Sequence, residues 1–150
     1  MEKLPDSIKK FLQENKVVSV CFVDDQHQPH CINCFYAFDE DDISLIFKST
    51  YGTKHELLIK PNAPVAGTIL PDQIQITSLK GIQFNGFVRS DFVLGGATFN
   101  GHYAKAFPMS LMLPGYFWIV KLSFIKYTDN TLGFGNKTLW NKDSGSGSQL

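Results

Sequence analysis

The chain has 150 residues and no net formal charge, because 14 Lys and Arg residues balance 14 Asp and Glu residues. This length suits a single domain with a sizeable core. The balanced charge argues against a dedicated binder of nucleic acid or anionic membranes, which normally carries a basic patch. No stretch of the sequence reaches the roughly 18 consecutive apolar residues of a membrane span.

The N-terminal segment, MEKLPDSIKKFLQEN, is polar and lacks the apolar core of a signal peptide. We therefore expect a cytoplasmic protein. Its three cysteines are then expected to be reduced thiols rather than a disulfide framework.

In the first half of the chain, the apolar pattern predicts three strands between two helices. Helical spacing of apolar residues indicates an opening helix over residues 4–15. The acidic run at 39–42 is interpreted as a solvated hairpin tip, and a short helix is expected in ELLIKP, ending before Pro61. Strands are predicted at 17–24, 30–39 and 43–48.

The second half predicts further strands and one helix. Gly81 and Gly86 interrupt a long apolar segment and suggest bulges or a tight bend. The tail, 144–150, is low-complexity and expected to be disordered, which leaves one domain over 1–143. The predicted elements are a strand at 65–69, a long strand or bent pair over 74–91, a helix at 96–107 and a last strand at 115–129.

About six strands with few helices favour a closed antiparallel sheet, that is, a small β-barrel with peripheral helices. The helices are too few and too badly placed for a doubly wound parallel sheet. The predicted fold class is therefore mainly β.

Two motifs suggest chemistry but lack the context that it requires. Cys31-x-x-Cys34 has no second ligand pair for zinc, and in a strand its two side chains point to opposite faces, so we interpret both as buried structural thiols. LGFGNKT (132–138) resembles a phosphate loop, but Asn136 stands where a P-loop needs glycine. What remains is a glycine-rich loop beside Trp140 that packs on a partner subunit or closes over a flat ligand. No metal site is expected.

The junction KSTYGTKHE (48–56) joins the third strand to the short helix. Thr53 and Glu56 match a capping box, which by itself requires no ligand. The same helix start could hold a phosphate, because free amides and the helix dipole favour an anion there. Lys54 in the first turn opposes the dipole, which indicates an anion nearby. The residues alone leave both interpretations open. The histidines are interpreted as surface or satisfied polar residues.

The order of KSTYGTKHELLIKPNAPVAGTI, GIQFNGFV and FWIVKLSFIKYTDN resembles the FMN-binding split barrels related to pyridoxamine-phosphate oxidase. Within that superfamily the chain is most similar to the YhbP-like branch of small bacterial proteins, which shares KH-type helix starts, a PVAGT strand, G-x-Q-F-x-G and a closing TDNTLGFG. The resemblance spans about Ser7 to Asp143. It implies a six-stranded split barrel that forms a homodimer, with FMN in clefts between the subunits.

The resemblance also implies site residues. In such proteins hydroxyl and basic groups after the third strand grip the FMN phosphate, part of the second strand lies beside the flavin ring, and further residues reach across the dimer. The matching positions are Lys48, Ser49, Thr50, Thr53 and Lys54 for the phosphate, Asn33, Cys34, Phe35, Tyr36 and Gln83 for the ring, and Trp118, Lys137 and Trp140 across the dimer.

One departure narrows the implied function. A true pyridoxamine-phosphate oxidase holds its substrate's phosphate with arginines toward the C-terminus, and this chain has none after Arg89. That activity is not expected. The leading hypothesis is a dimeric FMN-dependent oxidoreductase acting on a small molecule. The alternative is a non-enzymatic split-barrel module that binds haem, another flavin or a small metabolite, or a cofactor-free dimeric interaction protein.

Overall fold

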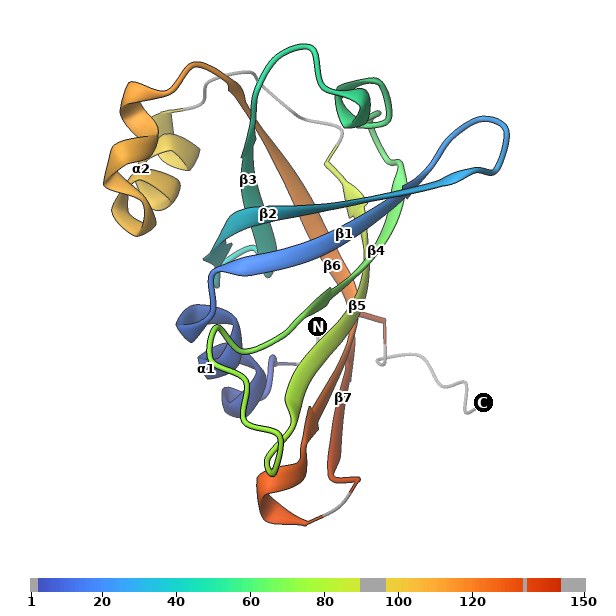
Figure 1. The fold of residues 1–150 in the computed structure, drawn as a ribbon, viewed down its shortest axis with the longest axis vertical. Coiled ribbons are helices and arrows are strands. Elements are labelled where there is room, and N and C mark those ends of the chain that lie inside the picture. Colours follow the sequence, from blue (N-terminus) through green and yellow to red (C-terminus); the bar gives the residue numbers. More distant parts are fainter. Residues whose placement is uncertain (1–2, 90–96, 134, 144–150) are drawn as a thin grey trace.

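The computed structural model describes residues 3–89, 97–133 and 135–143 (Figure 1). The seven strands form one antiparallel sheet in the order β3-β2-β1-β4-β5-β6-β7, and an additional pairing of β3 with β6 closes six of them into a barrel. The predicted mainly β barrel is confirmed, with β7 as an extra strand bonded to β6. The strands are β1 (Val17–Val23), β2 (Pro29–Asp39), β3 (Ser44–Ser49), β4 (Pro64–Ile69), β5 (Lys80–Val88), β6 (Tyr116–Asp129) and β7 (Lys137–Asn141).

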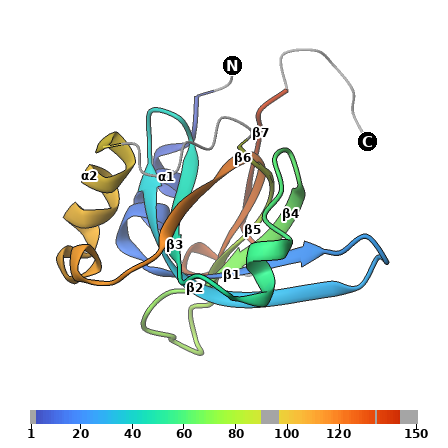
Figure 2. The same ribbon diagram turned by 90° about the horizontal axis from the view of Figure 1, so that it is seen from above.

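Short helices surround the barrel. In Figure 2 the barrel is seen from above, with α2 outside it on one side and the β1–β2 hairpin reaching out on the other. The long apolar stretch required of a membrane-crossing helix occurs in no helix of the described chain. The helices are α1 (Asp6–Glu14) and α2 (Ala97–Ala106), with 3₁₀ turns η1 (Lys54–Leu57), η2 (Pro108–Met112) and η3 (Asn130–Leu132).

The barrel interior is filled by the alternate residues of each strand, as the two-residue period of a strand requires. Trp118 is fully buried there and stacks on Phe47 with ring centroids 4.1 Å apart. Helix α1 adds buried side chains to the same core, and its Phe11 ring lies 5.2 Å from that of Tyr127. The opening helix therefore forms because its apolar stripe has a barrel to cover.

The pairing of β5 with β6 is irregular at Gly86, where the sequence predicted a bulge in β5, but the extra residue, Ser123, lies on β6. The register of β5 on β6 shifts between Asn85 and Gly86. A Cβ at Gly86 would lie 2.5 Å from the carbonyl oxygen of Lys121, so only glycine fits this close approach. No such shift accompanies Gly81, whose register on β6 is regular.

The predicted strand over 74–91 is too long at its start. Strand β5 begins at Lys80, and the preceding residues form turns. Ile74 and Ile76 are 62% and 95% exposed, so their alternation with polar residues covers no core. Residues 90–91, like residue 96 of the predicted helix, lie outside the described residues.

The C-terminal glycine-rich segment was also misjudged. Residues 137–141 are a strand, β7, and Trp140 is 1% exposed in the core opposite Ile125 of β6. Trp140, which was predicted to reach across a dimer, is therefore buried in its own barrel. Phe134 of that segment and the tail 144–150 lie outside the described residues.

The acidic run is more than a solvated turn. The Asp39 carboxylate is buried and accepts the backbone N–H of Asp41 at 3.1 Å. Asp42 forms ion pairs with Arg89 at 3.0 Å and with Lys121 at 2.5 Å. The run thus joins the β2–β3 hairpin to β6.

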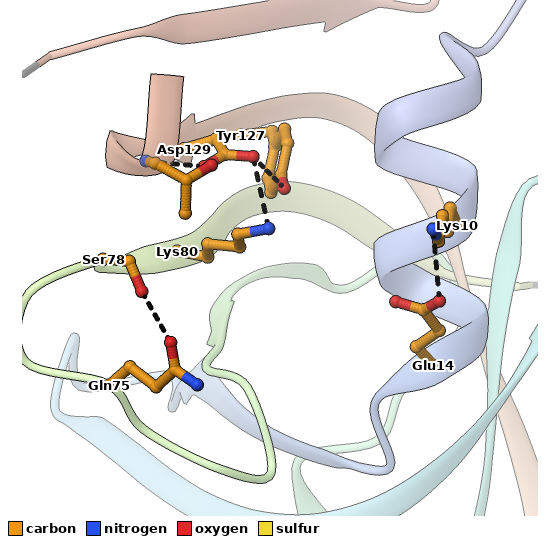
Figure 3. Close-up of polar contacts among 8 residues, drawn as sticks. Lys10, Glu14, Gln75, Ser78, Lys80, Tyr127 and Asp129 are labelled. Atoms are coloured by element: carbon orange, nitrogen blue, oxygen red, sulfur yellow. Dashed lines mark hydrogen bonds and ion pairs between the residues drawn. The ribbon is translucent and has the colours of Figure 1, made fainter. Parts of the chain in front are cut away.

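The far end of β6 is fixed by Asp129, as Figure 3 shows. Its carboxylate accepts the Tyr127 hydroxyl at 3.1 Å and lies 3.5 Å from the Lys80 ammonium group at the start of β5. Burial alone would raise the pKa of Asp129. The hydrogen bonds from Thr131 and Tyr127 and the charge of Lys80 outweigh it and lower that pKa.

Candidate functional site

The predicted capping box at the KSTYGTKHE junction is wrong. Thr53 is the N-cap residue of η1, but its side chain does not cap the helix; its hydroxyl donates to the carbonyl of Thr50 at 3.2 Å. The Glu56 carboxylate accepts the N–H of Gly52 at 2.6 Å instead. The expected helix is a 3₁₀ turn of 4 residues, so it contributes little dipole for an anion.

Ser49, His55 and Trp118 form a polar network at one end of the barrel interior. The indole N–H of Trp118 donates to the Ser49 hydroxyl at 2.7 Å, and His55 Nε2 lies 3.0 Å from the same oxygen. Thr53 Oγ1 is also 3.1 Å from His55 Nε2. Burial, then His30, lowers the pKa of His55, while Glu56 opposes this shift. The network satisfies the polar groups of the buried Trp118 and Ser49, and the lowered pKa favours the neutral form of His55.

This network corrects the interpretation of Trp118 as a residue reaching across a dimer. Its side chain is fully buried in its own barrel. The spacing of the histidines indicated no partner for any of them, because His55 meets Ser49 only through the tight turn at Gly52, whose φ is 79°. A serine before a glycine turn and a histidine after it is the signal that could have indicated this contact.

Lys48 points to the opposite side of β3 from Ser49. Its ammonium group donates to the carbonyls of Ser110 and Leu113 at 2.5 and 2.6 Å, and it lies 5.3 Å from the centre of the Phe117 ring. These bonds fasten the η2 segment to the barrel. Thr50 and Lys54 are exposed. The five predicted phosphate residues therefore face the interior, the η2 segment and solvent, rather than one point.

A row of polar side chains crosses the outer face of the sheet. Ser19 of β1 pairs with Asn33 of β2 and with Thr68 of β4, Thr68 pairs with Gln83 of β5, and Gln83 pairs with Lys126 of β6. Directly opposed residues share a face of a sheet. Two predicted ring-side residues, Asn33 and Gln83, thus belong to one row on one face.

One end of this row forms the floor of an open groove of about 650 Å³. The Ser19 hydroxyl lies 2.5 Å from Asn33 Oδ1 on that floor. Phe35 is 56% exposed, and its ring lies 5.3 Å from that of Phe107, which follows α2. The groove is lined by Lys16, Val17, Ser19, Asn33, Phe35, Thr68, Leu70, Pro71, Asp72 and Phe107.

The other predicted residues lie away from the groove. Cys34 and Tyr36 occupy the inward face of β2, where the Tyr36 hydroxyl donates to the Leu12 carbonyl at 2.9 Å. Burial, with a smaller contribution from Cys31, raises the pKa of Cys34 to about 12. Lys137 is exposed at the start of β7. Within the described chain, no three His, Cys, Asp or Glu side chains are grouped to hold a metal ion.

Sequence reasoning missed Ser19, Thr68 and Phe107 as groove residues. Thr68 lies in the PVAGT segment, and a polar residue alternating with Val65 and Ile69 was a usable signal. Ser19 and Phe107 join the groove only through strand pairing and the packing of α2.

Comparison with known proteins places the chain in a family. No protein-family model matches the chain. The UPF0306 protein YhbP of Salmonella schwarzengrund is 35% identical over 138 residues, which cover 92% of this chain and 93% of that protein. The chain belongs to the UPF0306 family. The predicted similarity to YhbP-like proteins is confirmed.

Solved structures share the fold of this UPF0306 chain. A haem-binding protein from Mycobacterium smegmatis matches with a TM-score of 0.68 at 10% identity, over 92% of this chain and 59% of that one. An FAD-binding protein from the same organism matches with a TM-score of 0.63 at 13% identity, over 84% and 96%. At these identities the matches establish the split-barrel fold of the UPF0306 chain.

Proposed function

We propose that this UPF0306 protein binds a flavin, specifically FMN, in the outer groove and uses it in an oxidoreductase reaction. The observation that carries the proposal is the polar floor of Asn33, Ser19 and Thr68 between apolar groove walls. A flavin ring is flat, and hydrogen-bond donors and acceptors alternate along its edge. Amide and hydroxyl groups suit that edge, and apolar side chains suit the ring faces.

The Ser19–Asn33 hydrogen bond determines which group of Asn33 is available to a ligand. When the Ser19 hydroxyl donates to Asn33 Oδ1, the amide NH₂ of Asn33 becomes the group that can donate to a ligand. Thr68 can donate or accept, so the floor can satisfy both kinds of atom on a ring edge. Bound flavin supplies the hydride chemistry, and the protein binds and orients it.

The groove lining favours a flavin over haem. Haem iron is usually held by His, Cys, Met or Tyr. None of the described residues that line the groove is of these types. A flavin needs no such ligand. Haem and FAD are bound by the two M. smegmatis split barrels, which supports a cofactor role for the fold and leaves the choice between them to the lining.

The phosphate of FMN is proposed to lie by Thr50 and Lys54, whose side chains are exposed. Lys54 would supply charge but no bidentate fork. Lys48 would join them only by leaving the carbonyls of Ser110 and Leu113. This placement of the phosphate is based on the resemblance to FMN-binding split barrels.

A second copy of the chain is proposed to cover the outer face. This face exposes large apolar side chains beside the polar row, which is unusual for a surface that stays in water. The split-barrel resemblance implies a homodimer of this kind. A partner there would also shield the groove from water. The exposed residues are Val17, Val23, Phe35, Leu70 and Phe87.

The test is a titration of the purified chain with FMN, followed by quenching of flavin fluorescence. Thr68→Val keeps the side-chain shape but removes a floor hydroxyl, and it should raise the Kd about ten-fold, as expected for one lost hydrogen bond. The matched control, Thr128→Val on β6, should leave the Kd unchanged.

Absence of binding by the wild-type chain at micromolar FMN would refute the proposal. A Soret band on addition of haem, without flavin binding, would support the haem-module alternative instead. Equal loss of affinity in Thr68→Val and Thr128→Val would move the site away from the groove.

A further inference from the structure

The fold separates the two cysteines of the Cys-x-x-Cys motif, and strand pairing brings a different pair of cysteines together. Cys31 and Cys34 lie three residues apart on β2, about 10 Å along the strand, with side chains on opposite faces. That separation exceeds the roughly 7 Å between Cα atoms that a disulfide tolerates. Cys21 of β1, however, lies directly opposite Cys31.

The hydrogen bonds of the hairpin show which kind of pair this is. Tyr36 N–H donates to the Lys16 carbonyl, and Asp24 N–H donates to the Gln28 carbonyl. These are hydrogen-bonded pairs of the β1–β2 register, and such pairs alternate with non-hydrogen-bonded ones. Counting from either end makes Cys21–Cys31 a non-hydrogen-bonded pair. The Cα atoms of such a pair are about 4.5 Å apart.

This spacing falls at the short end of the range that a disulfide spans, about 4.4 to 6.8 Å. The neighbouring pair of the same kind, Ser19–Asn33, already brings its side-chain oxygens to 2.5 Å. Both thiols are free in the structure. A bond between them therefore needs little movement of the backbone.

Solvent can reach the pair. Cys31 is exposed and Cys21 is partly exposed, whereas Cys34 faces the core. In Figures 1 and 2 the turn of the β1–β2 hairpin extends beyond the rest of the barrel. Cys21 lies further in, where it also pairs with Ala66 of β4, so the exposure of the pair comes from its place on the outer face of the sheet. Burial also keeps the Cys34 thiol protonated, with a pKa of about 12, and a protonated thiol is a poor nucleophile.

We infer that Cys21 and Cys31 form a redox modification site, which a peroxide converts into a cross-strand disulfide. The Cys31 thiolate attacks one peroxide oxygen, the O–O bond breaks, and sulfenic acid and water form. The Cys21 thiol then displaces the hydroxyl from sulfur as a second water. Two thiols and one hydrogen peroxide thus give one disulfide and two waters, and two electrons pass from sulfur to oxygen.

The inference is independent of flavin binding, since it rests on strand register and on thiol exposure in the single chain. The second copy proposed above would cover this face, so the disulfide forms in the chain before it dimerises, and the peroxide is added at a concentration where the chain is monomeric. A chain that binds no flavin should still form the disulfide. Because the pair is exposed, dithiothreitol should reduce the disulfide.

The experiment treats the reduced full chain with a small molar excess of hydrogen peroxide and measures intact mass and disulfide-linked peptides. We expect a loss of two hydrogens per chain, reversed by dithiothreitol, with Cys21 and Cys31 in the linked peptides. Cys34→Ala should behave like the wild type. Cys21→Ser and Cys31→Ser should form no intramolecular disulfide.

Three results would overturn the inference. Linked peptides that contain Cys34 would show that the disulfide does not form between the paired residues Cys21 and Cys31. Disulfides only between chains, seen on a non-reducing gel, would show that the two thiols of one hairpin do not meet. Addition of oxygen without loss of two hydrogens in the wild type would show that the sulfenic acid is not resolved by its neighbour.

Discussion

The two faces of the same sheet differ in whether their polar side chains already have hydrogen-bond partners within the barrel. On the inner face, the polar groups of Trp118 and Tyr36 are bonded within the barrel, to Ser49 and to the Leu12 carbonyl. On the outer face, Asn33 and Thr68 lie in an open groove beside exposed apolar residues. Adjacent residues of one strand therefore serve stability and binding in turn, because side chains alternate between faces.

The largest effect should come from the inner face. Trp118→Ala removes a fully buried indole and its hydrogen bond to Ser49, and we expect a loss of about 4 kcal/mol in the free energy of unfolding. Phe35→Ala, on the outer face, should cost about 1 kcal/mol or less, since its ring contacts mainly Phe107.

Urea denaturation of both variants measures this difference. If Phe35→Ala destabilised the chain as much as Trp118→Ala, the outer face would be part of the core and the contrast between the faces would fail.

A smaller effect is expected for assembly. Phe87→Lys places a charge on the exposed apolar part of the outer face and should weaken the proposed dimer at least ten-fold, about 1.4 kcal/mol, with little change in monomer stability. Light scattering across a dilution series reports the dissociation constant. Leu57→Lys, which alters an equally apolar but separate exposed site on η1, is the control. A chain that is monomeric at all concentrations would remove the second copy from the proposal.

The smallest effect concerns the polar network at the barrel end. The pKa of His55 is lower in the folded state, so the unfolded chain binds its proton more readily. Stability should be complete above the ordinary histidine pKa of 6.5 and should decrease as the pH falls below that value. His55→Gln should make the pH dependence of the melting temperature shallower between about pH 6.5 and 5. An unchanged or steeper profile would mean that His55 is not held neutral by folding.

Local sequence determined most of the elements. The bounds of β1, β2 and α1 were predicted to within about a residue or two, from the apolar patterns in residues 17–24 and 30–39 and the helical stripe around Phe11. These patterns are clear because each element has one apolar face that packs against the core. The exceptions were short or unpartnered segments. Strand β7 has only 5 residues, too few for a clear period, and the exposed isoleucines at 74 and 76 imitate a strand that has no partner.

The site was predictable only in part, for the same reason. The resemblance to split barrels implied that Asn33 to Tyr36 and Gln83 lie beside a flavin ring, and it gave all four residues from Asn33 to Tyr36 the same role. Pleating divides these four residues, so Asn33 and Phe35 face the groove while Cys34 and Tyr36 face the core. Residues of KSTYGTKHE were likewise predicted to form one phosphate site, although in β3 the Lys48 side chain points outward and the Ser49 side chain points inward.

By itself, the sequence determined the mainly β class, the order along the chain of the six barrel strands, and which strand residues alternate between apolar and polar. Only the tertiary structure decided which strands are neighbours, and with them the row through Ser19, Thr68 and Gln83 and the pairing of Cys21 with Cys31. The physical reason is that register is set by which side chains the assembled sheet buries and by the geometry of the turns, and a shift of one residue would turn every one of these side chains to the other face.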